Sequence, residues 1–390
     1  MKWPMEKLGV VAPAKPIKKP KIADPNSVWL LNLDMVESHT GRVIEKLFCS
    51  PNEAGTSTHW FDENYVLYSK LRPYLNKVVV PDGLGLATTE LVPMLPDPER
   101  LDKKYLAYYL RSEQFVRWVN EQVAGAKMPR VSMKIFWEHE IPLPPLEEQK
   151  RIVAILDKAD AICQKRQQAI SLTDDFLRSV FLDMFGDPIT NPKKWGMQSI
   201  GKLLQIKHGF AFKSEFFTSK GEYILMTPGN FFESGGYRNR QEKQNYYNGK
   251  IPEGYVLNAG DLLIAMTEQT TGLLGSCLVV PDAGKFLHNQ RLGLLKFNQD
   301  ALTPEYLYYL FNNKSVRQAI QVSATGTKVR HTSPNKIEEI ISIVPDIETQ
   351  VRFSEIVQFI TEIKNNLEPS ESEIKKLFNS LSQKAFSGQL

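Results

Sequence analysis

The chain has 390 residues, about two to three times the length of a typical domain, so we expect it to divide into at least two compact units. Hydrophobic residues make up 42% of the sequence and charged residues 24%, which excludes a collagen-like or wholly disordered protein. The formal net charge is +4; residues 1–145 hold 19 Lys and Arg against 17 Asp and Glu, and residues 186–344 hold 18 against 13. An excess of Lys and Arg could neutralise the phosphates of a nucleic acid, although ordinary solvated surfaces account for it equally well.

No stretch of the sequence has the character of a membrane anchor or a secretion signal. Its apolar runs are shorter than the roughly 20 residues that span a bilayer, and residues 1–21 are rich in Pro and Lys. Cys49, Cys163 and Cys277 are far apart and form no C-x-x-C pair, so we expect reduced thiols and no cysteine zinc site. We therefore expect a cytoplasmic protein without a membrane partner.

The strongest feature of the sequence is an internal repeat. Residues 141–151, IPLPPLEEQKR, align with residues 342–352, SIVPDIETQVR, at an offset of 201. An offset of 200 joins the YYL sequence at residues 108–110 to the same sequence at residues 308–310. The chain therefore contains two copies of one unit of roughly 190 to 200 residues.

The first copy opens with residues 1–145, which we predict to fold as a domain of mixed helices and strands. Residues 77–81 are typical of a strand bounded by turn residues, and residues 103–119 have the periodicity of a helix. The tyrosines of that helix, and those of its counterpart in the second copy, are candidate core residues: Tyr105, Tyr108, Tyr109, Tyr306, Tyr308 and Tyr309.

A long helix is predicted at residues 146–187. Its apolar positions advance in alternating steps of three and four, which is the spacing of a coiled-coil seam. Residues 146–185 alone would make a rod of about 60 Å at roughly 1.5 Å per residue.

Residues 188–344 form the corresponding second domain. We expect strands at residues 223–226, 262–265 and 276–280, and a helix at residues 304–320. The two domains share a skeleton but differ in detail, as expected when one scaffold carries two different recognition surfaces.

The C-terminal helix, residues 345–390, repeats the register of the central helix, because each seam position recurs 201 residues later. We predict that the two helices pack against one another, with a kink or restart at Pro369. The seam candidates are Ile152, Ile155, Ile162, Phe176, Phe353, Ile356, Ile363 and Leu377. The alternative is that each helix covers only its own domain.

Basic loops supply the candidate DNA-binding residues. Each copy has a glycine loop with two basic residues just before its final strand and helix, and Arg and Lys on such loops can hold phosphates or read guanine edges. Further basic stretches have aromatic or amide neighbours. The candidates are Lys70, Arg72, Lys127, Arg130, Lys207, Lys213, Arg238, Arg240, Lys328 and Arg330. The alternative for each is an ordinary exposed loop.

Catalytic and metal-binding motifs are missing or incomplete. Residues 196–203 approach a phosphate-binding loop, but Leu203 stands where a magnesium-binding Ser or Thr is required. Asp97 and Asp102 faintly suggest the acidic cluster of a nuclease, although a turn and a helix start explain them more simply. The six histidines have no ligand spacing. We therefore predict no catalytic residue, no metal site and no cofactor bound by this chain.

Two stretches of the sequence resemble motifs of one family. Residues 141–149, IPLPPLEEQ, open the long helix and residues 181–188, FLDMFGDP, close it; together they resemble the central conserved region of the specificity subunit of type I restriction-modification systems. Residues 344–350 and 385–390 resemble the second conserved region of that family, with Asp346 where the first copy has Pro145. The resemblance extends over essentially the whole chain.

The resemblance implies an α+β fold in which two similar mixed α/β target-recognition domains are separated by two long antiparallel coiled-coil helices. It also implies a non-catalytic subunit that reads one half of a split, asymmetric double-stranded DNA site with each domain. The helices would dock two methyltransferase subunits, which would bring S-adenosylmethionine, and a motor-nuclease restriction subunit using ATP and Mg²⁺ could join them. Leu156, Phe181 and Met184, beside the seam, are candidates for the partner contacts or else pack against the recognition domains.

Two other functions stay open at this point. A coiled-coil scaffold that binds only protein would show no salt-dependent DNA binding. A standalone nuclease would cleave DNA with Mg²⁺ in the absence of any partner.

Overall fold

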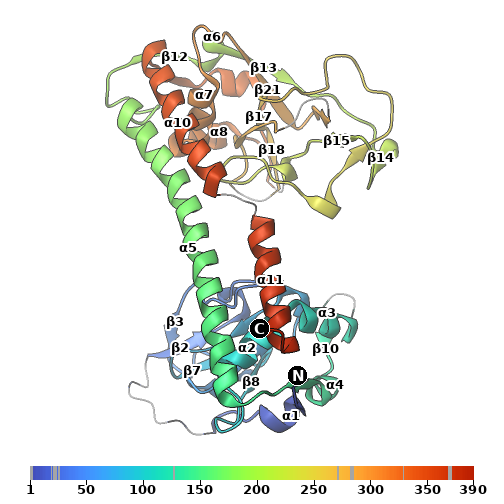
Figure 1. Cartoon of the computed structure of the whole chain (residues 1–390). Helices are drawn as coiled ribbons and strands as arrows, with labels where there is room; N and C mark the ends of the chain where they lie inside the picture. The colour runs from blue at the N-terminus through green and yellow to red at the C-terminus, as the bar shows by residue number, and fades with distance from the viewer. Residues whose placement is uncertain are drawn as a thin grey trace. The chain divides into compact units, whose positions relative to one another are not determined.

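The structure is a computed structural model of the whole chain (Figure 1). It describes residues 3–18, 20, 24, 27–125, 128–269, 272–281, 285–327, 329–367 and 371–390, except the side chains of residues 366, 367 and 371–375. The chain folds into two compact units, which we call the first unit, Met1–Gln167 with Glu368–Leu390, and the second unit, Gln168–Leu367. The long helix α5 (Leu146–Phe185) therefore begins in the first unit and ends in the second.

Two small sheets form the body of the first unit. The mixed sheet has the strand order β3-β2-β7-β4, with β2 parallel to β7 and the other neighbours antiparallel. The antiparallel sheet has the order β6-β5-β8. The bounds are β2 (Val28–Leu31), β3 (Leu47–Cys49), β4 (Thr58–Phe61), β5 (Val66–Ser69), β6 (Val78–Val79), β7 (Gly85–Thr88) and β8 (Leu91–Met94). Every residue of β2, β5 and β8 is buried, because both faces of these strands are covered.

The second unit has the same kind of skeleton. An antiparallel sheet has the order β13-β21-β17-β19, and a mixed sheet has the order β14-β16-β15-β20 with β15 parallel to β20. The bounds are β13 (Leu204–His208), β14 (Phe217–Thr218), β15 (Tyr223–Leu225), β16 (Tyr246–Tyr247), β17 (Leu262–Ala265), β19 (Cys277–Val279), β20 (Phe286–Leu287) and β21 (Leu292–Phe297). The three strands predicted in this segment are thus present, each within two residues of the expected bounds.

A short ladder closes each unit at the start of its long helix. In the first unit β1 (Met5–Lys7) pairs with β11 (Glu140–Pro142), and in the second β12 (Gly196–Ser199) pairs with β23 (Ile341–Val344), both antiparallel. The remaining short elements are α1 (Leu8–Val11), β9 (Val123–Ala124), β10 (Arg130–Val131), α4 (Met133–Glu138), α6 (Ile200–Leu203), β18 (Thr267–Glu268), β22 (Arg330–His331) and α9 (Pro334–Glu338).

Each helix predicted from the tyrosine-rich segments is in fact a pair of helices. The first copy has α2 (Lys103–Arg111) and α3 (Glu113–Glu121), and the second has α7 (Pro304–Asn312) and α8 (Lys314–Ser323). The break falls at Ser112 and Asn313, whose side chains accept N–H groups from the following turn. A polar side chain that caps a new helix competes with continuing the old one, so the single-helix prediction was wrong at these two positions.

The tyrosines of α2 and α7 lie in the cores or pack against them, as predicted for both copies. Tyr105 and Tyr306 are fully buried, and their hydroxyls donate to Pro142 O and Ile343 O, each at 2.9 Å. These acceptors are 201 residues apart, as are the two donors. The sequence repeat is therefore also a repeat of hydrogen bonds.

The C-terminal region forms two helices, α10 (Ile347–Leu367) and α11 (Glu371–Ser387). Within the second unit α10 lies beside the last turns of α5 (Figure 1): the Phe353 ring is 5.6 Å from that of Phe181, and Lys364 pairs with Asp174 at 2.9 Å. These contacts make α10 and that part of α5 antiparallel. The predicted kink at Pro369 lies outside the described residues.

Within the first unit α11 packs on the aromatic core of the first domain. The ring of Phe386 lies 5.3 Å from that of Tyr105 and 5.2 Å from that of Tyr109. Arg151, near the start of α5, donates to Leu390 O at 3.1 Å. Each unit therefore combines one predicted domain with helical segments from both copies of the repeat.

Candidate nucleic-acid interface

The glycines of the two loops have the same left-handed backbone conformation. Gly125 and Gly326 have φ angles of +101° and +102°, where residues with a Cβ are disfavoured. At Gly326 a Cβ would also lie 2.1 Å from Val329 O, so this loop closes only around a glycine. Each loop leads into a short strand, β10 or β22, that begins with an arginine. Lys127 and Lys328, predicted as DNA-binding residues, lie outside the described residues.

The arginine after each loop is paired with a glutamate of its own unit. Arg130 donates to Glu90 from Nη2 at 2.8 Å and from Nε at 3.1 Å, and these hydrogen bonds lower the pKa of Glu90 and raise that of Arg130. Arg330 donates to Glu268 at 3.2 Å and to Gln321 O at 2.6 Å. Because the protein already compensates the charge of both arginines, these contacts support a structural role for them.

Glu268 and Arg317 hold the two sides of one backbone turn, residues 272–274. The Glu268 side chain is 1% exposed, and its Oε2 accepts the N–H groups of all three turn residues at 2.8–3.0 Å. Arg317 donates to the first and last carbonyl oxygens of the turn and, at 2.9 Å, to Glu233 O; burial lowers the pKa of this guanidinium. We call these contacts the frame. The frame fixes two loops of the second unit relative to one another.

Beside the frame lies a hollow of about 700 Å³, which we call the arginine hollow. Three arginines line it: Arg238 and Arg240 from the loop before β16, and Arg291 from the turn between β20 and β21. Their guanidinium groups form no hydrogen bond or ion pair with the residues that the structure describes, although Arg238 lies over the Phe232 ring, 5.9 Å from its centroid. The arginine hollow therefore gathers cations that remain available to an outside ligand, in contrast to the arginines after the glycine loops.

Two further candidates of the first unit lie beside its glycine loop. The backbone N–H of Arg72 donates to Pro129 O at 2.8 Å, and that of Val131 donates to Lys70 O at 3.1 Å. The Arg72 side chain is exposed and Lys70 is partly buried. The structure thus brings together two basic stretches that are some sixty residues apart in the sequence.

The remaining two candidates are in the second unit. Lys207 donates to Gly254 O at 2.6 Å and lies 4.6 Å from the centre of the Tyr255 ring, so protein groups surround its ammonium. Lys213 is exposed, with its ammonium 3.7 Å from Glu215. Of the two, Lys213 is the more accessible to a phosphate.

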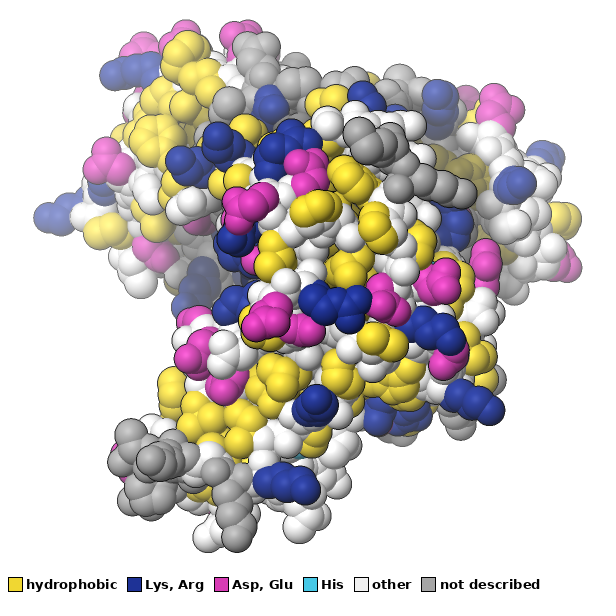
Figure 2. Space-filling model, turned by 60° about the horizontal axis from the view of Figure 1, so that its bottom comes forward, with side chains coloured by type: hydrophobic (Ala, Val, Ile, Leu, Met, Phe, Trp, Pro, Cys, Tyr) yellow, Lys and Arg dark blue, Asp and Glu magenta, His cyan; other side chains and the backbone are white. Residues whose placement is uncertain are grey.

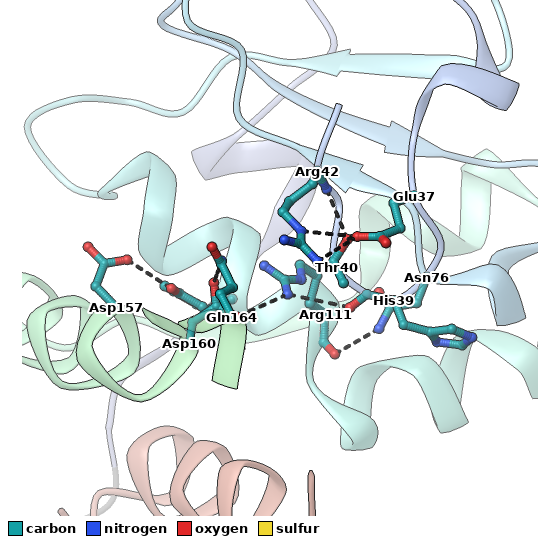
Figure 3. Close-up of polar contacts among 10 residues, drawn as sticks. Glu37, His39, Thr40, Arg42, Asn76, Arg111, Asp157, Asp160 and Gln164 are labelled. Atoms are coloured by element: carbon teal, nitrogen blue, oxygen red, sulfur yellow. Dashed lines mark hydrogen bonds and ion pairs between the residues drawn. The ribbon is translucent and has the colours of Figure 1, made fainter. Parts of the chain in front are cut away.

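A partly buried arginine that the sequence did not indicate lies in the first unit (Figure 3). Arg111, the last residue of α2, donates to His39 O at 3.4 Å and lies 4.0 Å from the Asp160 carboxylate on α5. Its own carbonyl accepts a hydrogen bond from the Asn76 side chain at 3.0 Å. Burial lowers the pKa of the guanidinium, whose Nε has no hydrogen-bond partner among the described residues. Arg111 therefore ties the loop around residue 39 and the first half of α5 to the domain core.

The helix-seam candidates differ in burial according to their position. Near the helix ends, Ile152 and Phe353 are fully buried in the cores of their own units, and Ile155 and Ile356 are partly buried. The exposed fractions of the other four are 63% for Ile162, 50% for Phe176, 37% for Ile363 and 68% for Leu377. At these four described positions the structure has no buried seam. The heptad spacing predicts an apolar stripe, but it does not determine what covers that stripe.

The three residues considered for partner contacts all lie in or against a core. Leu156 and Phe181 are 0% and 2% exposed, each in the core of its own unit, and Met184 packs against the second core. Burial against the recognition domains is therefore the correct alternative for these side chains. Other apolar residues of α5 are exposed instead, among them Leu172 at 58% and Leu182 at 46%.

The acidic pair considered for a nuclease has structural roles. Asp97 accepts the N–H of Glu99 at 3.1 Å within a turn, and Asp102 caps α2 by accepting the N–H groups of Lys104 and Tyr105. Across the described ranges, no group of three or more His, Cys, Asp or Glu is placed to hold a metal ion. None of the helices in the described part of the chain is long and apolar enough to cross a membrane.

Charges of both signs are mixed on the face drawn in Figure 2, where Lys and Arg side chains lie among Asp and Glu. Within the first unit, Lys7 pairs with Glu138 and Arg100 with Glu6, which also joins charges of opposite sign. A surface of this kind produces no strong field of one sign, so local groups such as those of the arginine hollow carry the stronger indication of nucleic-acid binding.

Sequence reasoning missed Arg291 and the frame for different reasons. Arg291 ends the polar stretch HNQR, residues 288–291, between two apolar strands, and such a polar tip is a signal that could have found it. Glu268 and Arg317 have no local signal, because their partners lie in other parts of the chain.

Comparison with protein families gives a match over most of the chain. The family described as "Type I restriction modification DNA specificity domain" matches residues 61–172 and 192–376. The specificity subunit of the type I restriction enzyme MjaVIII of Methanocaldococcus jannaschii is 23% identical over 314 residues, which are 76% of this chain and 73% of that protein. The EcoKI specificity subunit of Escherichia coli K12 is 22% identical over 319 residues, 75% of this chain and 67% of that protein.

Solved structures show a similar fold. One chain, from a study of complex assembly and conformational transition of the type I R-M system, has a TM-score of 0.57 at 18% identity and covers 100% of this chain and 98% of its own length. The S subunit of the type I restriction-modification system of M. genitalium has a TM-score of 0.53 at 15% identity, with coverage of 99% and 96%. At these identities the likeness concerns the mixed α+β fold alone.

Proposed function

Because this chain belongs to the family of type I restriction-modification DNA specificity subunits, we propose that it reads a split, asymmetric DNA site with one recognition domain for each half. As a specificity subunit it is not itself the catalytic component of the enzyme. The recognition domains in this proposal are residues 1–145 and 188–344, and the connecting helices are residues 146–187 and 345–390.

The observation that carries the proposal is the combination of a repeated skeleton with unequal basic surfaces. Both copies keep the buried tyrosine hydrogen bonds and the left-handed glycine of the basic loop. The basic groups that stay accessible differ, since the first unit offers Arg72 beside its glycine loop and the second offers the arginine hollow. Two scaffolds of one shape with different contact groups favour two different half-sites and hence an asymmetric motif.

Exposed apolar side chains on the helices support a docking surface for methyltransferase subunits. Leu172 and Phe176 are neighbours on one face of α5, 58% and 50% exposed, and Phe359 and Ile363 are neighbours on α10, 62% and 37% exposed. Large apolar residues gathered on a surface are typical of protein interfaces. Because the helical segments occur in two copies, the proposal includes two methyltransferase subunits, one for each copy.

The chemistry in this proposal belongs to the partners. S-adenosylmethionine would bind to the methyltransferase subunits, which transfer its methyl group to adenine. ATP and Mg²⁺ would be used by a restriction subunit if one joins the complex. A chain that reads DNA has to work where the DNA is, so the proposal places it in the cytoplasm.

The experiment is to co-express the chain with its neighbouring methyltransferase and to map modified adenines across the host genome by single-molecule sequencing. We expect a split, asymmetric motif that appears only when both proteins are present. Co-purification of the two proteins with no modified motif would contradict sequence reading by this chain and favour a scaffold that binds only protein. Cleavage of DNA by the lone chain with Mg²⁺, abolished by Asp97→Ala, would instead support a nuclease.

A further inference from the structure

The arginine hollow contains one guanidinium whose position is restricted by the backbone. Arg240 is partly buried and lies against Gly229 of a short 3₁₀ turn, Pro228–Asn230. A Cβ on Gly229 would lie 3.1 Å from Cζ of Arg240 and 3.2 Å from its Nε and Nη1. A side chain at Gly229 would therefore require the guanidinium to shift by a few tenths of an ångström from its present position. The backbone N–H of Arg240 also donates to the buried Gln244 side chain at 3.3 Å.

The other two arginines of the hollow have more freedom. Arg238 and Arg291 are exposed. Among the described residues, the one contact of the Arg238 guanidinium is with the ring of Phe232, which is itself 47% exposed. A held guanidinium can select hydrogen-bond geometry, whereas an exposed one contributes mainly charge. Arg240 is therefore suited to selecting hydrogen-bond geometry, and Arg238 and Arg291 are suited to supplying charge.

Neutral polar groups complete the arginine hollow. The side chains of Gln269 and Asn245 line it and make no hydrogen bond with the residues described. The Glu268 carboxylate also borders the hollow. Its oxygens already accept hydrogen bonds from the backbone turn of the frame and from Arg330. Guanidinium and amide groups are the side chains that read base edges in the DNA major groove, with Arg bidentate to guanine and Asn or Gln to adenine.

We propose that the arginine hollow receives a base edge of the half-site read by the second recognition domain, with Arg240 as the specificity-determining residue. Arg238 and Arg291, at the exposed side, hold the flanking phosphates. Gly229 is a positioning residue, because it lets the Arg240 guanidinium lie against the backbone. This inference rests on the proposed function and adds to it the place and the chemistry of one base contact.

The test uses the full chain in complex with its methyltransferase and compares four variants with the parental protein. Arg240→Lys keeps the charge and removes the bidentate fork. Gly229→Ala removes no charged group but shifts the Arg240 guanidinium by a few tenths of an ångström. Arg291→Ala removes one exposed cation. Lys220→Ala, at an exposed lysine away from the hollow lining, is the matched control. Thermal unfolding of each complex checks that the variants fold.

Two readouts separate a base contact from a phosphate contact. In the methylation motif, we expect Arg240→Lys and Gly229→Ala to relax one base-pair position of the second half and to leave the first half unchanged. In binding to DNA probes, Arg240→Lys should reduce discrimination at that base pair roughly tenfold or more, whereas Arg291→Ala should weaken all probes alike and flatten the salt dependence. Lys220→Ala should change neither readout.

Three results would overturn this inference. An unchanged motif in both Arg240→Lys and Gly229→Ala would exclude a base contact in the arginine hollow. A uniform loss of binding in Arg240→Lys with no change in discrimination would make Arg240 a phosphate ligand only. If the parental complex itself produced no split motif, the proposed function would fail and this inference with it, and that result is known before any variant is tested.

Discussion

Gln149 and Gln350 make the same three hydrogen bonds in the two units, 201 residues apart in the sequence. Each side chain is fully buried at the start of its long helix. The Gln149 amide oxygen accepts the N–H of Asp102 at 2.9 Å, and its nitrogen donates to the carbonyl oxygens of Arg100 and Pro144 at 2.8 Å. For Gln350 the partners are the corresponding residues Thr303, Ala301 and Pro345, at 3.0, 3.2 and 3.0 Å. The glutamine of the repeated motif therefore joins each helix to its own domain.

Replacing either glutamine should destabilise the unit that contains it. Gln149→Ala or Gln350→Ala leaves one N–H and two carbonyl groups buried without partners, for which we expect a loss of about 3 kcal/mol. Thermal unfolding of the full chain measures this loss, and Gln167→Ala, at an exposed position of α5, is the matched control. A loss no larger than that of the control would show that the three hydrogen bonds do not hold the helix to the domain.

Cys277 should serve as a probe for opening of the second unit. The thiol is fully buried and burial raises its pKa, while Cys49 and Cys163 are partly exposed. We expect a thiol reagent to modify two cysteines of the native protein readily and the third only when the second unit opens. Gln350→Ala should accelerate the slow reaction roughly 100-fold, as a loss of about 3 kcal/mol implies, and Gln149→Ala should not. Three equally fast reactions would contradict the burial of Cys277.

Arg330 should matter more for stability than for binding DNA. Arg330→Ala removes the partner of the buried Glu268 carboxylate, although three backbone N–H groups still hold that carboxylate, so we expect a loss of about 2 kcal/mol. Arg291→Ala should leave stability almost unchanged, because its guanidinium has no partner among the described residues. Calorimetry on both variants tests the contrast. Equal stabilities would mean that the pair with Glu268 contributes nothing.

The stability of the second unit should fall between pH 6.5 and pH 4 because of His288. Burial lowers the pKa of this histidine to about 4, and its Nε2–H donates to Leu292 O at 2.9 Å. In this pH range the unfolded chain binds a proton that the folded unit excludes, so stability is present above the unfolded pKa and is lost as the pH falls toward 4. We expect a contribution of about 2 to 3 kcal/mol over that range.

The His288→Gln variant isolates this effect, since glutamine keeps an N–H donor but does not titrate. The rate of Cys277 modification, measured from pH 7 to pH 4.5 and corrected for the thiolate fraction, reports opening of the second unit. The parental protein should open progressively more easily as the pH falls, and the variant should show a flatter dependence. Identical slopes would exclude His288 as the source.

The repeat in the sequence predicted the elements that depend on local pattern. The strand at residues 262–265 and the helix from residue 146 follow from apolar spacing, and both are present. The break at Ser112 was missed, although a capping serine before Glu113 is a local signal. The helical periodicity continues across both α2 and α3, so it did not reveal that Ser112 is the N-cap of α3.

The candidate site was only partly accessible to sequence reasoning, because its contacts are long-range. The pairing of Arg130 with Glu90 joins residues 40 positions apart, and nothing in either local sequence indicates it. The arginine hollow likewise assembles from loops whose order in space depends on the sheets. Basic residues could be recognised from the sequence, but which of them stay unpaired is decided by the tertiary fold.

The most direct test of the account is to exchange residues 188–344 for the corresponding segment of a relative that reads a different site, and to map methylated adenines with the same methyltransferase. The account predicts that one half of the split motif changes to the relative's sequence, while the other half and the spacing between the halves stay the same. A motif that is unchanged, or that changes in both halves, would contradict the assignment of one recognition domain to each half-site.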